Sequence, residues 1–227
     1  MSCDIINNDM VCYGGLDCQV KIYDFQKKQE HVIGKHTAAV SCVIYVEAFN
    51  YVISSSWDCS VKIWDPTPGA SQTPLFELKQ NHKVYTMAVS KDLKLFLALD
   101  ERQIVVYDLK DLSKPLLNRE CLLKYNTRSL CPLLDGSGFI VGSIEGRVGV
   151  EYLTESETNK PFSFRCHRTK DNFGTEMIYP VNAIAMHPVF GTFATGGADG
   201  SVCVWDAAAK KRLAYFPNYV PGIACLA

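Results

Sequence analysis

The sequence lacks the features that would place it in several common classes of protein. It has no run of 18 apolar residues that could form a transmembrane helix, and its first ten residues, MSCDIINNDM, contain neither a basic segment nor an apolar core. These absences predict a soluble, intracellular protein with no membrane partner. The 23 Lys and Arg residues balance 24 Asp and Glu residues. Because no overall charge attracts a polyanion, we expect no direct nucleic-acid partner.

The ten cysteines lack the spacing of a metal site or of a disulfide framework. None of them form a CxxC pair, and several occupy apolar positions within alternating segments. We therefore expect small buried hydrophobic residues in a reducing compartment, with no bound metal and no cofactor.

The chain does contain one short pattern five times: a polar turn followed by a β-branched strand that ends near an aromatic and an acidic residue. The copies span residues 17–24 (DCQVKIYD), 58–65 (DCSVKIWD), 100–108 (DERQIVVYD), 145–152 (EGRVGVEY) and 199–206 (DGSVCVWD). Their last residues are separated by intervals of 41, 43, 44 and 54 residues. The first three intervals match the period of roughly 40 to 45 residues that is typical of a WD-repeat propeller blade.

Within each repeat, short alternating apolar runs are separated by Gly, Asp, Asn and Ser, which predicts antiparallel β-structure. In the second repeat the predicted strands cover residues 40–45, 51–55, 61–65 and 75–79. The sequence thus predicts an all-β WD-repeat β-propeller fold with five complete four-stranded blades. We expect residues 1–227 to form a single domain, with repeat units ending near residues 24, 65, 108, 152 and 206.

Two repeats contain a set of polar residues that we expect to be structural. The set comprises His36, Ser54, Asp58 and Trp64 in the second repeat, and Thr195, Asp199 and Trp205 in the last. A buried His and Asp at such positions would satisfy each other and nearby turn amides, so a catalytic triad is not expected. Cys166 next to His167 is no better as a nucleophile and base, because adjacent strand residues point to opposite faces. We predict no catalytic residue and no enzymatic activity.

The long fourth interval is explained by an insertion. His36 precedes Val40 by four residues, whereas the matching His167 precedes Val181 by fourteen. An insertion of ten residues, over roughly 168–178, therefore lies in the loop between the last strand of one blade and the first strand of the next.

The fourth repeat differs from the others at three arginines. We align Arg128 with Val40, Val84 and Val181 at the start of the first strand, and Arg147 with Gln19, Ser60, Gln103 and Ser201 at the start of the third. Arg165 lies on the fourth strand of the same blade. Because the first and third strands start where the fourth ends, the three cations should lie on one face and could bind an acidic or phosphorylated peptide.

Other interpretations of these residues remain open. Each arginine could be a solvated surface charge, or could pair with Glu145, Glu151 or Glu155. Trp57 precedes the turn residue Asp58 and could be an exposed aromatic anchor on the same face or a half-buried packing residue.

Several segments resemble a known family over almost the whole chain. They are LKYNTR (ending at 128), GSIEGRVGVEYL (142–153), FSFRCHR (162–168), IYPVNAIAMHP (178–188), TFATGGADGSVCVWD (192–206) and KKRL (210–213). Together they resemble the mitotic spindle-checkpoint WD-repeat proteins, the third budding-uninhibited-by-benzimidazole family. The related messenger-RNA export WD-repeat factors, which bind a nucleoporin, share the SIEGRV and CHR segments; KVYTMAVS (83–90) and VEYL (150–153) favour the checkpoint branch.

The resemblance implies a non-enzymatic adaptor found in the nucleus and, during mitosis, at the kinetochore, with a cytoplasmic pool. Its partners would be GLEBS-type segments of the checkpoint kinase and its relative, and phosphorylated MELT motifs of the outer-kinetochore scaffold. The resemblance implies that the arginines of the family's EGRV and F-R/K-CHR motifs, here Arg147 and Arg165, bind acidic or phosphorylated peptides, with Arg128 beside them. The family has seven blades, so the resemblance also implies that the first blade and most of the last are absent, and that the chain ends within the first strand of the last blade.

A receptor for a cullin ubiquitin ligase is a further alternative. Such receptors carry Arg two positions after the WD pair, where this chain has Gln26, Thr67, Lys110 and Ala208. This difference argues against that function.

Overall fold

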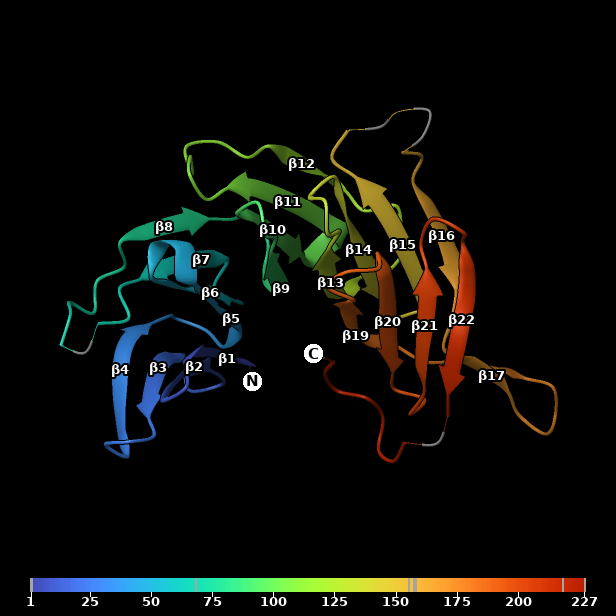
Figure 1. Cartoon of the computed structure of the whole chain (residues 1–227), viewed down its shortest axis with the longest axis horizontal. Coiled ribbons are helices and arrows are strands. Elements are labelled where there is room, and N and C mark those ends of the chain that lie inside the picture. Colours follow the sequence, from blue (N-terminus) through green and yellow to red (C-terminus); the bar gives the residue numbers. More distant parts are fainter. Residues whose placement is uncertain (1, 68, 155, 157–158, 218, 227) are drawn as a thin grey trace. The chain divides into compact units, whose positions relative to one another are not determined.

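The computed structural model describes residues 2–67, 69–154, 156, 159–217 and 219–226. Almost all regular structure in this part of the chain is β-strand, arranged in five four-stranded antiparallel sheets and one two-stranded sheet (Figure 1). Two short 3-10 helices, η1 (Glu47–Phe49) and η2 (Asp100–Arg102), connect strands. Neither is long and apolar enough to span a bilayer.

The chain divides into two compact units, Met1–Val89 and Ser90–Ala227. In the first unit, one sheet has the order β1-β2-β3-β4 and the next has the order β5-β6-β7-β8. The strands are β1 (Ser2–Asn7), β2 (Met10–Gly14), β3 (Gln19–Asp24), β4 (Gln29–Lys35), β5 (Val40–Val46), β6 (Tyr51–Ser56), β7 (Ser60–Trp64) and β8 (Phe76–Lys79). The unit ends with β9 (Val84–Val89), the first strand of the third sheet.

The second unit contains the rest of the third sheet and two further four-stranded sheets, β13-β14-β15-β16 and β19-β20-β21-β22. Its strands are β10 (Lys94–Leu99), β11 (Gln103–Asp108), β12 (Leu117–Glu120), β13 (Thr127–Pro132), β14 (Gly138–Ser143), β15 (Arg147–Tyr152), β16 (Phe162–Arg165), β17 (Arg168–Lys170), β18 (Glu176–Ile178), β19 (Val181–Met186), β20 (Thr192–Gly197), β21 (Val202–Asp206) and β22 (Lys211–Phe216). The predicted insertion forms the two-stranded β17–β18 hairpin.

The predicted all-β WD-repeat fold is confirmed, and the repeated pattern ends with the third strand of each sheet. Strands β3, β11, β15 and β21 end at Asp24, Asp108, Tyr152 and Asp206, and β7 ends at Trp64. The four strands predicted for the second repeat are present within one or two residues at each end. The prediction of a single domain over residues 1–227 stays a prediction.

Two details of the sequence prediction were wrong. A further strand was expected at the end of the chain, but described residues 219–226 form no strand. They make isolated backbone hydrogen bonds, such as that from Ile223 N to Gly197 O at 2.9 Å. The cysteines were expected to be buried, but Cys3 and Cys225 are exposed, and Cys18, Cys42, Cys59 and Cys131 are only partly buried. Cys12, Cys121, Cys166 and Cys203 are buried as expected.

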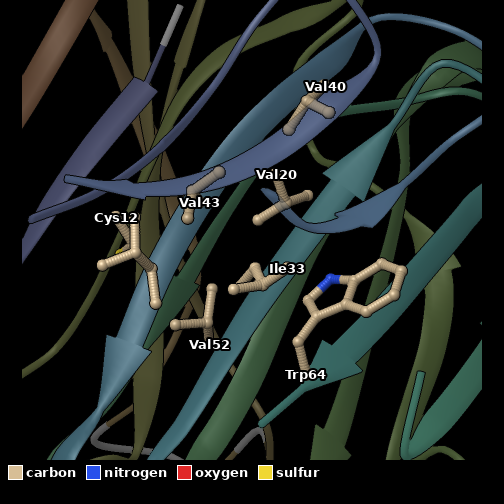
Figure 2. Close-up of a cluster of buried hydrophobic side chains, with 8 residues drawn as sticks. Cys12, Val20, Ile33, Val40, Val43, Val52 and Trp64 are labelled. Carbon is tan, nitrogen blue, oxygen red and sulfur yellow. The ribbon is translucent and has the colours of Figure 1, made fainter. Parts of the chain in front are cut away.

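The core of the first unit lies between its first two sheets. Val20 and Ile22 from β3 pack with Val40 and Val43 from β5, and Trp64 closes the cluster (Figure 2). Gly34 on β4 makes this packing possible, since a Cβ added there would lie 2.2 Å from the Trp64 ring. The buried face of β3, where burial alternates residue by residue, thus packs against Val40 and Val43 of β5 and joins one blade to the next.

The core of the second unit joins its last two sheets in a similar way. Ile140, Val148 and Val150 pack with Val181 and Phe193 across the sheets. The Phe164 ring on β16 lies 4.5 Å from the Trp205 ring on β21, measured between centroids. This contact fixes the outer strand of the fourth sheet against the fifth sheet, and so helps to position Arg165.

The polar set predicted in the second repeat forms a hydrogen-bonded chain. His36 Nδ1 lies 2.9 Å from Asp58 Oδ2, His36 Nε2 lies 2.7 Å from Ser54 Oγ, and Trp64 Nε1 donates to the same hydroxyl at 2.7 Å. Burial lowers the pKa of His36, against the opposing effect of Asp58. A neutral imidazole that donates through Nδ1 and accepts the Ser54 hydroxyl proton at Nε2 satisfies every member of the chain.

The last repeat contains the same hydrogen-bond network, completed by a histidine from the preceding loop. His167 Nδ1 lies 2.9 Å from Asp199 Oδ1, and His167 Nε2 lies 2.8 Å from Thr195 Oγ1. Trp205 Nε1 donates to the same Thr195 hydroxyl at 2.9 Å. Burial also lowers the pKa of His167. Each network ties a loop to strands of the following sheet, which is the structural role expected for these residues.

Candidate functional site

The main feature of the fourth sheet is a direct pair of arginines. Arg147, the first residue of β15, is the cross-strand partner of Arg165, the last residue of β16. Directly opposed residues of an antiparallel pair point to the same face of the sheet, and like charges at such positions destabilise the sheet. The chain therefore keeps two cations together at one sheet end, where an anion could bind both.

The corresponding positions of three other sheets pair differently. Gln19 is opposite Lys35, Ser60 is opposite Lys79, and Gln103 is opposite Glu120. In each of these pairs at most one residue is a cation. The opposed arginines are therefore not required by the blade architecture.

The two arginines also differ in their local partners. Arg147 Nε lies 3.6 Å from Glu145 Oε1, an ion pair too long for a strong hydrogen bond. Arg165 is exposed, and its side chain makes no hydrogen bond or ion pair with another described residue. The guanidinium of Arg165 is therefore available to a ligand, and that of Arg147 is held only weakly.

The turn before Arg147 is fixed by a third arginine that the sequence did not single out. Arg168 donates from Nη2 to Glu145 O at 2.8 Å and from Nε to Gly146 O at 3.3 Å. Gly146 has a φ of +63°, and a Cβ there would lie 2.7 Å from Cys166 O. Glycine fits this left-handed position without strain, and the two hydrogen bonds from Arg168 hold the turn that presents Arg147.

Arg128 lies at the same end of the sheet, but not at the position that the alignment gave it. Thr127 pairs with Ser143 as Val40 pairs with Ser56, and a β-bulge follows each of the two residues. The buried Thr127 therefore matches the strand-initial valine, and Arg128 occupies the bulge held elsewhere by Ser41 and Asn182. The alignment was wrong by one residue because the buried strand-initial position holds the polar Thr127 in this repeat and Val40 or Val181 in the others.

The exposed Arg128 is still near the arginine pair. Its strand, β13, lies two positions from β15 in the sheet order. With about 4.8 Å between neighbouring strands, its backbone is about 10 Å from that of Arg147. Arg147 and Arg165 are thus the pair suited to one anion, while Arg128 could contact another part of an extended ligand.

The acidic residues considered as partners for the arginines have different roles. Glu145 pairs with Arg147, whereas Glu151 is almost fully buried and binds Arg119, with Glu151 Oε2 3.3 Å from Arg119 Nη2. Glu151 Oε1 also accepts the Leu122 amide at 2.9 Å. Glu155 lies outside the described residues. Glu151 occupies the aromatic position of the other repeats and joins β15 to β12, a role that no sequence signal revealed.

A polar pocket of about 300 Å³ borders Arg165. Its lining includes Arg165, Arg168, Glu176, Asp199, Arg212 and Tyr215. The two acids are already engaged, since Glu176 lies 2.9 Å from Arg168 Nη1 and Asp199 binds His167. An incoming anion would therefore meet cations whose neighbouring carboxylates have other partners.

Cys166 and His167 next to this pocket do not form a nucleophile and base. Cys166 is buried, and burial strongly raises the pKa of its thiol. His167 uses both ring nitrogens in the Asp199 and Thr195 network. The thiol is held protonated, which is the opposite of the state that a catalytic cysteine needs.

Trp57 lies in the first compact unit and is 44% exposed. Its amide donates to Ala39 O at 3.1 Å, which fixes the turn but leaves much of the ring in solvent. Leu16 and Ile144 at the matching turns are exposed as well, so an apolar residue there is a general feature of the repeat. That Trp57 shares a face with the arginines stays a prediction.

Comparison with known proteins agrees with this architecture. The family model described as "WD domain, G-beta repeat" matches residues 27–65 and 174–206. These segments contain the β7 and β21 copies of the repeated pattern, together with most of the two histidine networks.

Relatives of two kinds are similar over nearly the whole chain. "Mitotic checkpoint protein BUB3.1" of Arabidopsis thaliana is 41% identical over 93% of this chain and 63% of its own length. "Mitotic checkpoint protein bub-3" of Caenorhabditis elegans is 37% identical over 100% of this chain and 66% of its own. The "Poly(A)+ RNA export protein" of Schizosaccharomyces pombe is 36% identical over 95% of this chain and 60% of its own length.

The chain thus spans less than two thirds of the length of these relatives. The similarity nevertheless covers all five four-stranded sheets, including the fourth sheet with its two opposed arginines. The resemblance to the mitotic-checkpoint WD-repeat family is confirmed, and the chain is a WD-repeat protein.

Proposed function

We propose that this protein is a non-enzymatic adaptor of the spindle assembly checkpoint that binds acidic and phosphorylated peptide segments. The observation that carries the proposal is the cross-strand pairing of Arg147 with Arg165, next to a pocket whose acids are already engaged. Guanidinium groups match carboxylates and phosphates in geometry, and charge-assisted hydrogen bonds to them are about twice as strong as neutral ones. Similarity to proteins named as mitotic checkpoint proteins supports the same assignment.

The proposed ligands are GLEBS-type segments of the checkpoint kinase and its relative, and phosphorylated MELT motifs of the outer-kinetochore scaffold. A single phosphate would bind Arg147 and Arg165, which are adjacent across the strands. Arg128 would contact another part of the same segment. That Trp57 acts as an apolar anchor stays a separate prediction. The protein would then act in the nucleus and at the kinetochore in mitosis, with a cytoplasmic pool.

Peptide binding to purified full-length chain tests this proposal. A MELT peptide with phosphothreonine should bind more tightly than the unphosphorylated form, and Arg147→Ala should remove the difference. Arg102→Ala is a matched control, because Arg102 lies just before the third strand of the third sheet and pairs with Glu120 at 2.7 Å. Equal loss in both variants would point to a general charge effect and would reject the site.

A second candidate is a messenger-RNA export factor that binds a nucleoporin GLEBS segment. Similarity to the Schizosaccharomyces pombe export protein, at an identity close to that of the checkpoint proteins, supports it. Competition between a kinase GLEBS peptide and a nucleoporin GLEBS peptide separates the two candidates. Tighter binding of the nucleoporin peptide would favour export, and tighter binding of the kinase peptide would favour the checkpoint.

A further inference from the structure

The insertion in the last repeat is an ordered hairpin with a fixed tip. Strands β17 and β18 pair through Arg168 with Ile178, Thr169 with Met177, and Lys170 with Glu176. Asp171 closes the turn, because its Oδ1 accepts the amides of Phe173 and Thr175 at 2.9 and 2.8 Å. Gly174 takes the left-handed position with φ at +83°. The tip is therefore held by side-chain and backbone bonds.

The base of the hairpin is attached to the turn that presents Arg147. Arg168, the first residue of β17, donates to the carbonyl oxygens of Glu145 and Gly146 and pairs with Glu176 on β18. Tyr179 N donates to His167 O at 3.1 Å behind the hairpin. Arg168 and Glu176 also line the pocket that borders Arg165. The hairpin and the arginine pair thus belong to one continuous surface.

The hairpin presents apolar side chains that its own fold does not use. Phe173 is 94% exposed at the tip, and Met177 and Ile178 are also exposed on β18. The turn needs the Phe173 amide, the Asp171 carboxylate and a glycine, but no aromatic ring. Figure 1 shows the hairpin, labelled at β17, projecting outward from the strands of the second unit. A fully exposed aromatic ring on a rigid support is typical of a contact residue.

We infer that the β17–β18 hairpin is the apolar arm of the proposed peptide site, and that Phe173 contacts a bulky apolar side chain of the bound segment. This inference rests on the proposed function, since the acidic or phosphorylated group of the same segment is held by Arg147 and Arg165. Charge complementarity identifies the occupant as an acidic peptide, because Arg165, Arg168 and Arg212 line the adjoining pocket and Lys170 lies on the hairpin. The Glu176 carboxylate pairs with Arg168, and the Asp199 carboxylate accepts hydrogen bonds from His167 and Ser201.

The size of the hairpin sets the spacing within the ligand. Three residue pairs extend about 10 Å, and the turn adds a few ångströms. An extended peptide covers that distance in about three to five residues. The apolar side chain should therefore lie about three to five residues from the acidic group.

Substitution of Phe173, combined with alanine scanning of the peptide, tests the inference. The probe is a phosphorylated MELT peptide in which each apolar residue within five positions of the phosphothreonine is replaced in turn by Ala. Phe173→Ala should weaken binding of the parent peptide about tenfold, as truncation of a contact residue does. Phe173→Ala should weaken binding much less for the peptide that lacks the contacting apolar residue, because that peptide has already lost its contact with Phe173.

Two controls separate this inference from the proposed function. Val189→Ala removes another exposed apolar side chain from a turn of the fifth sheet and should leave binding unchanged. If Arg147→Ala abolishes binding while Phe173→Ala leaves it unchanged, the hairpin contact is rejected and the arginine site stands. If neither substitution changes binding, both proposals are rejected. An equal loss with every peptide variant, or with Val189→Ala, would also overturn the hairpin contact.

Discussion

Arg147 and Arg165 face each other across β15 and β16, and of the two only Arg147 makes an ion pair with a described acidic residue, Glu145 at 3.6 Å. Two cations at directly opposed positions repel each other at a sheet edge. The arrangement therefore reduces the stability of the unliganded sheet slightly, while it creates a site that an anion would stabilise. Stability and binding should respond in opposite directions when this pair is changed.

Arg165→Gln should leave the free energy of unfolding unchanged or raise it, by up to about 1 kcal/mol, because it removes the cross-strand repulsion. The same substitution should weaken binding of a phosphorylated peptide. Denaturant titration and peptide titration of one preparation measure both effects. Arg102→Gln, which removes the partner of Glu120, should give no gain in stability. A clear loss of stability in Arg165→Gln would show that this arginine is a structural residue.

The buried histidines predict a stability that falls as the pH falls. Burial lowers the pKa of both His36 and His167 in the folded chain, so the unfolded chain binds more protons below its own histidine pKa of about 6.5. The free energy of unfolding should therefore decrease between pH 7 and pH 5. Hydrogen bonds and the nearby His36 outweigh the effect of burial and lower the pKa of Asp58 to about 2, so its contribution is lost only below pH 4.

Denaturant midpoints measured from pH 7 to pH 5 check this dependence. Replacing His36 and His167 by Gln should flatten the curve, although both variants will be less stable. His187→Gln, in an exposed turn, should retain the slope. A wild-type stability that stays constant or rises toward pH 5 is incompatible with the neutral, buried histidines described above.

Removal of Glu151 should be strongly destabilising. Its carboxylate is buried, binds Arg119 and accepts the Leu122 amide, so Glu151→Ala removes the acidic partner of Arg119 and leaves a backbone donor without its acceptor. The expected loss is about 2 to 4 kcal/mol in the free energy of unfolding. Glu120→Ala removes an exposed acid that also pairs with an arginine, and should cost less than about 1 kcal/mol. Similar losses in the two variants would contradict the buried role of Glu151.

Gly34→Ala should disrupt the contact between β4 and Trp64. The added methyl group would lie 2.2 Å from the indole ring, so the ring or the strand must move. Overpacking of this kind costs about 1 to 3 kcal/mol. Gly149→Ala is the matched control, because that glycine is also within a strand but its nearest neighbour would be Val141 Cγ2 at 3.2 Å. Thermal unfolding should show a much larger loss for Gly34→Ala than for Gly149→Ala.

The strands and the structural polar residues could be predicted from the sequence because each depends on local pattern. Apolar alternation and polar turns define the sheets, and the matching of His167 with His36 correctly indicated a common loop position. The proximity of the opposed arginines could also be predicted, because strand order alone brings Arg147 and Arg165 to the same end of the sheet.

Other features depend on contacts that the pattern does not contain. The buried strand-initial position holds the polar Thr127 where the aligned repeats have Val40 and Val181, so the apolar pattern placed Arg128 one residue out of register. Arg168 was read as part of an insertion, but its bonds to Glu145 O and Gly146 O arise from tertiary packing. Glu151 was considered a surface partner because its burial depends on Arg119, which lies 32 residues earlier in the chain.

The most direct test of the central claim is the phosphate dependence of peptide binding measured by titration calorimetry. The wild-type chain should bind a phosphorylated MELT peptide about tenfold or more tightly than the unphosphorylated peptide, and Arg147→Ala should bind both with the same, weaker affinity. Equal affinity of the wild-type chain for the two peptides, or an undiminished preference in Arg147→Ala, would contradict a phosphate site at the arginine pair.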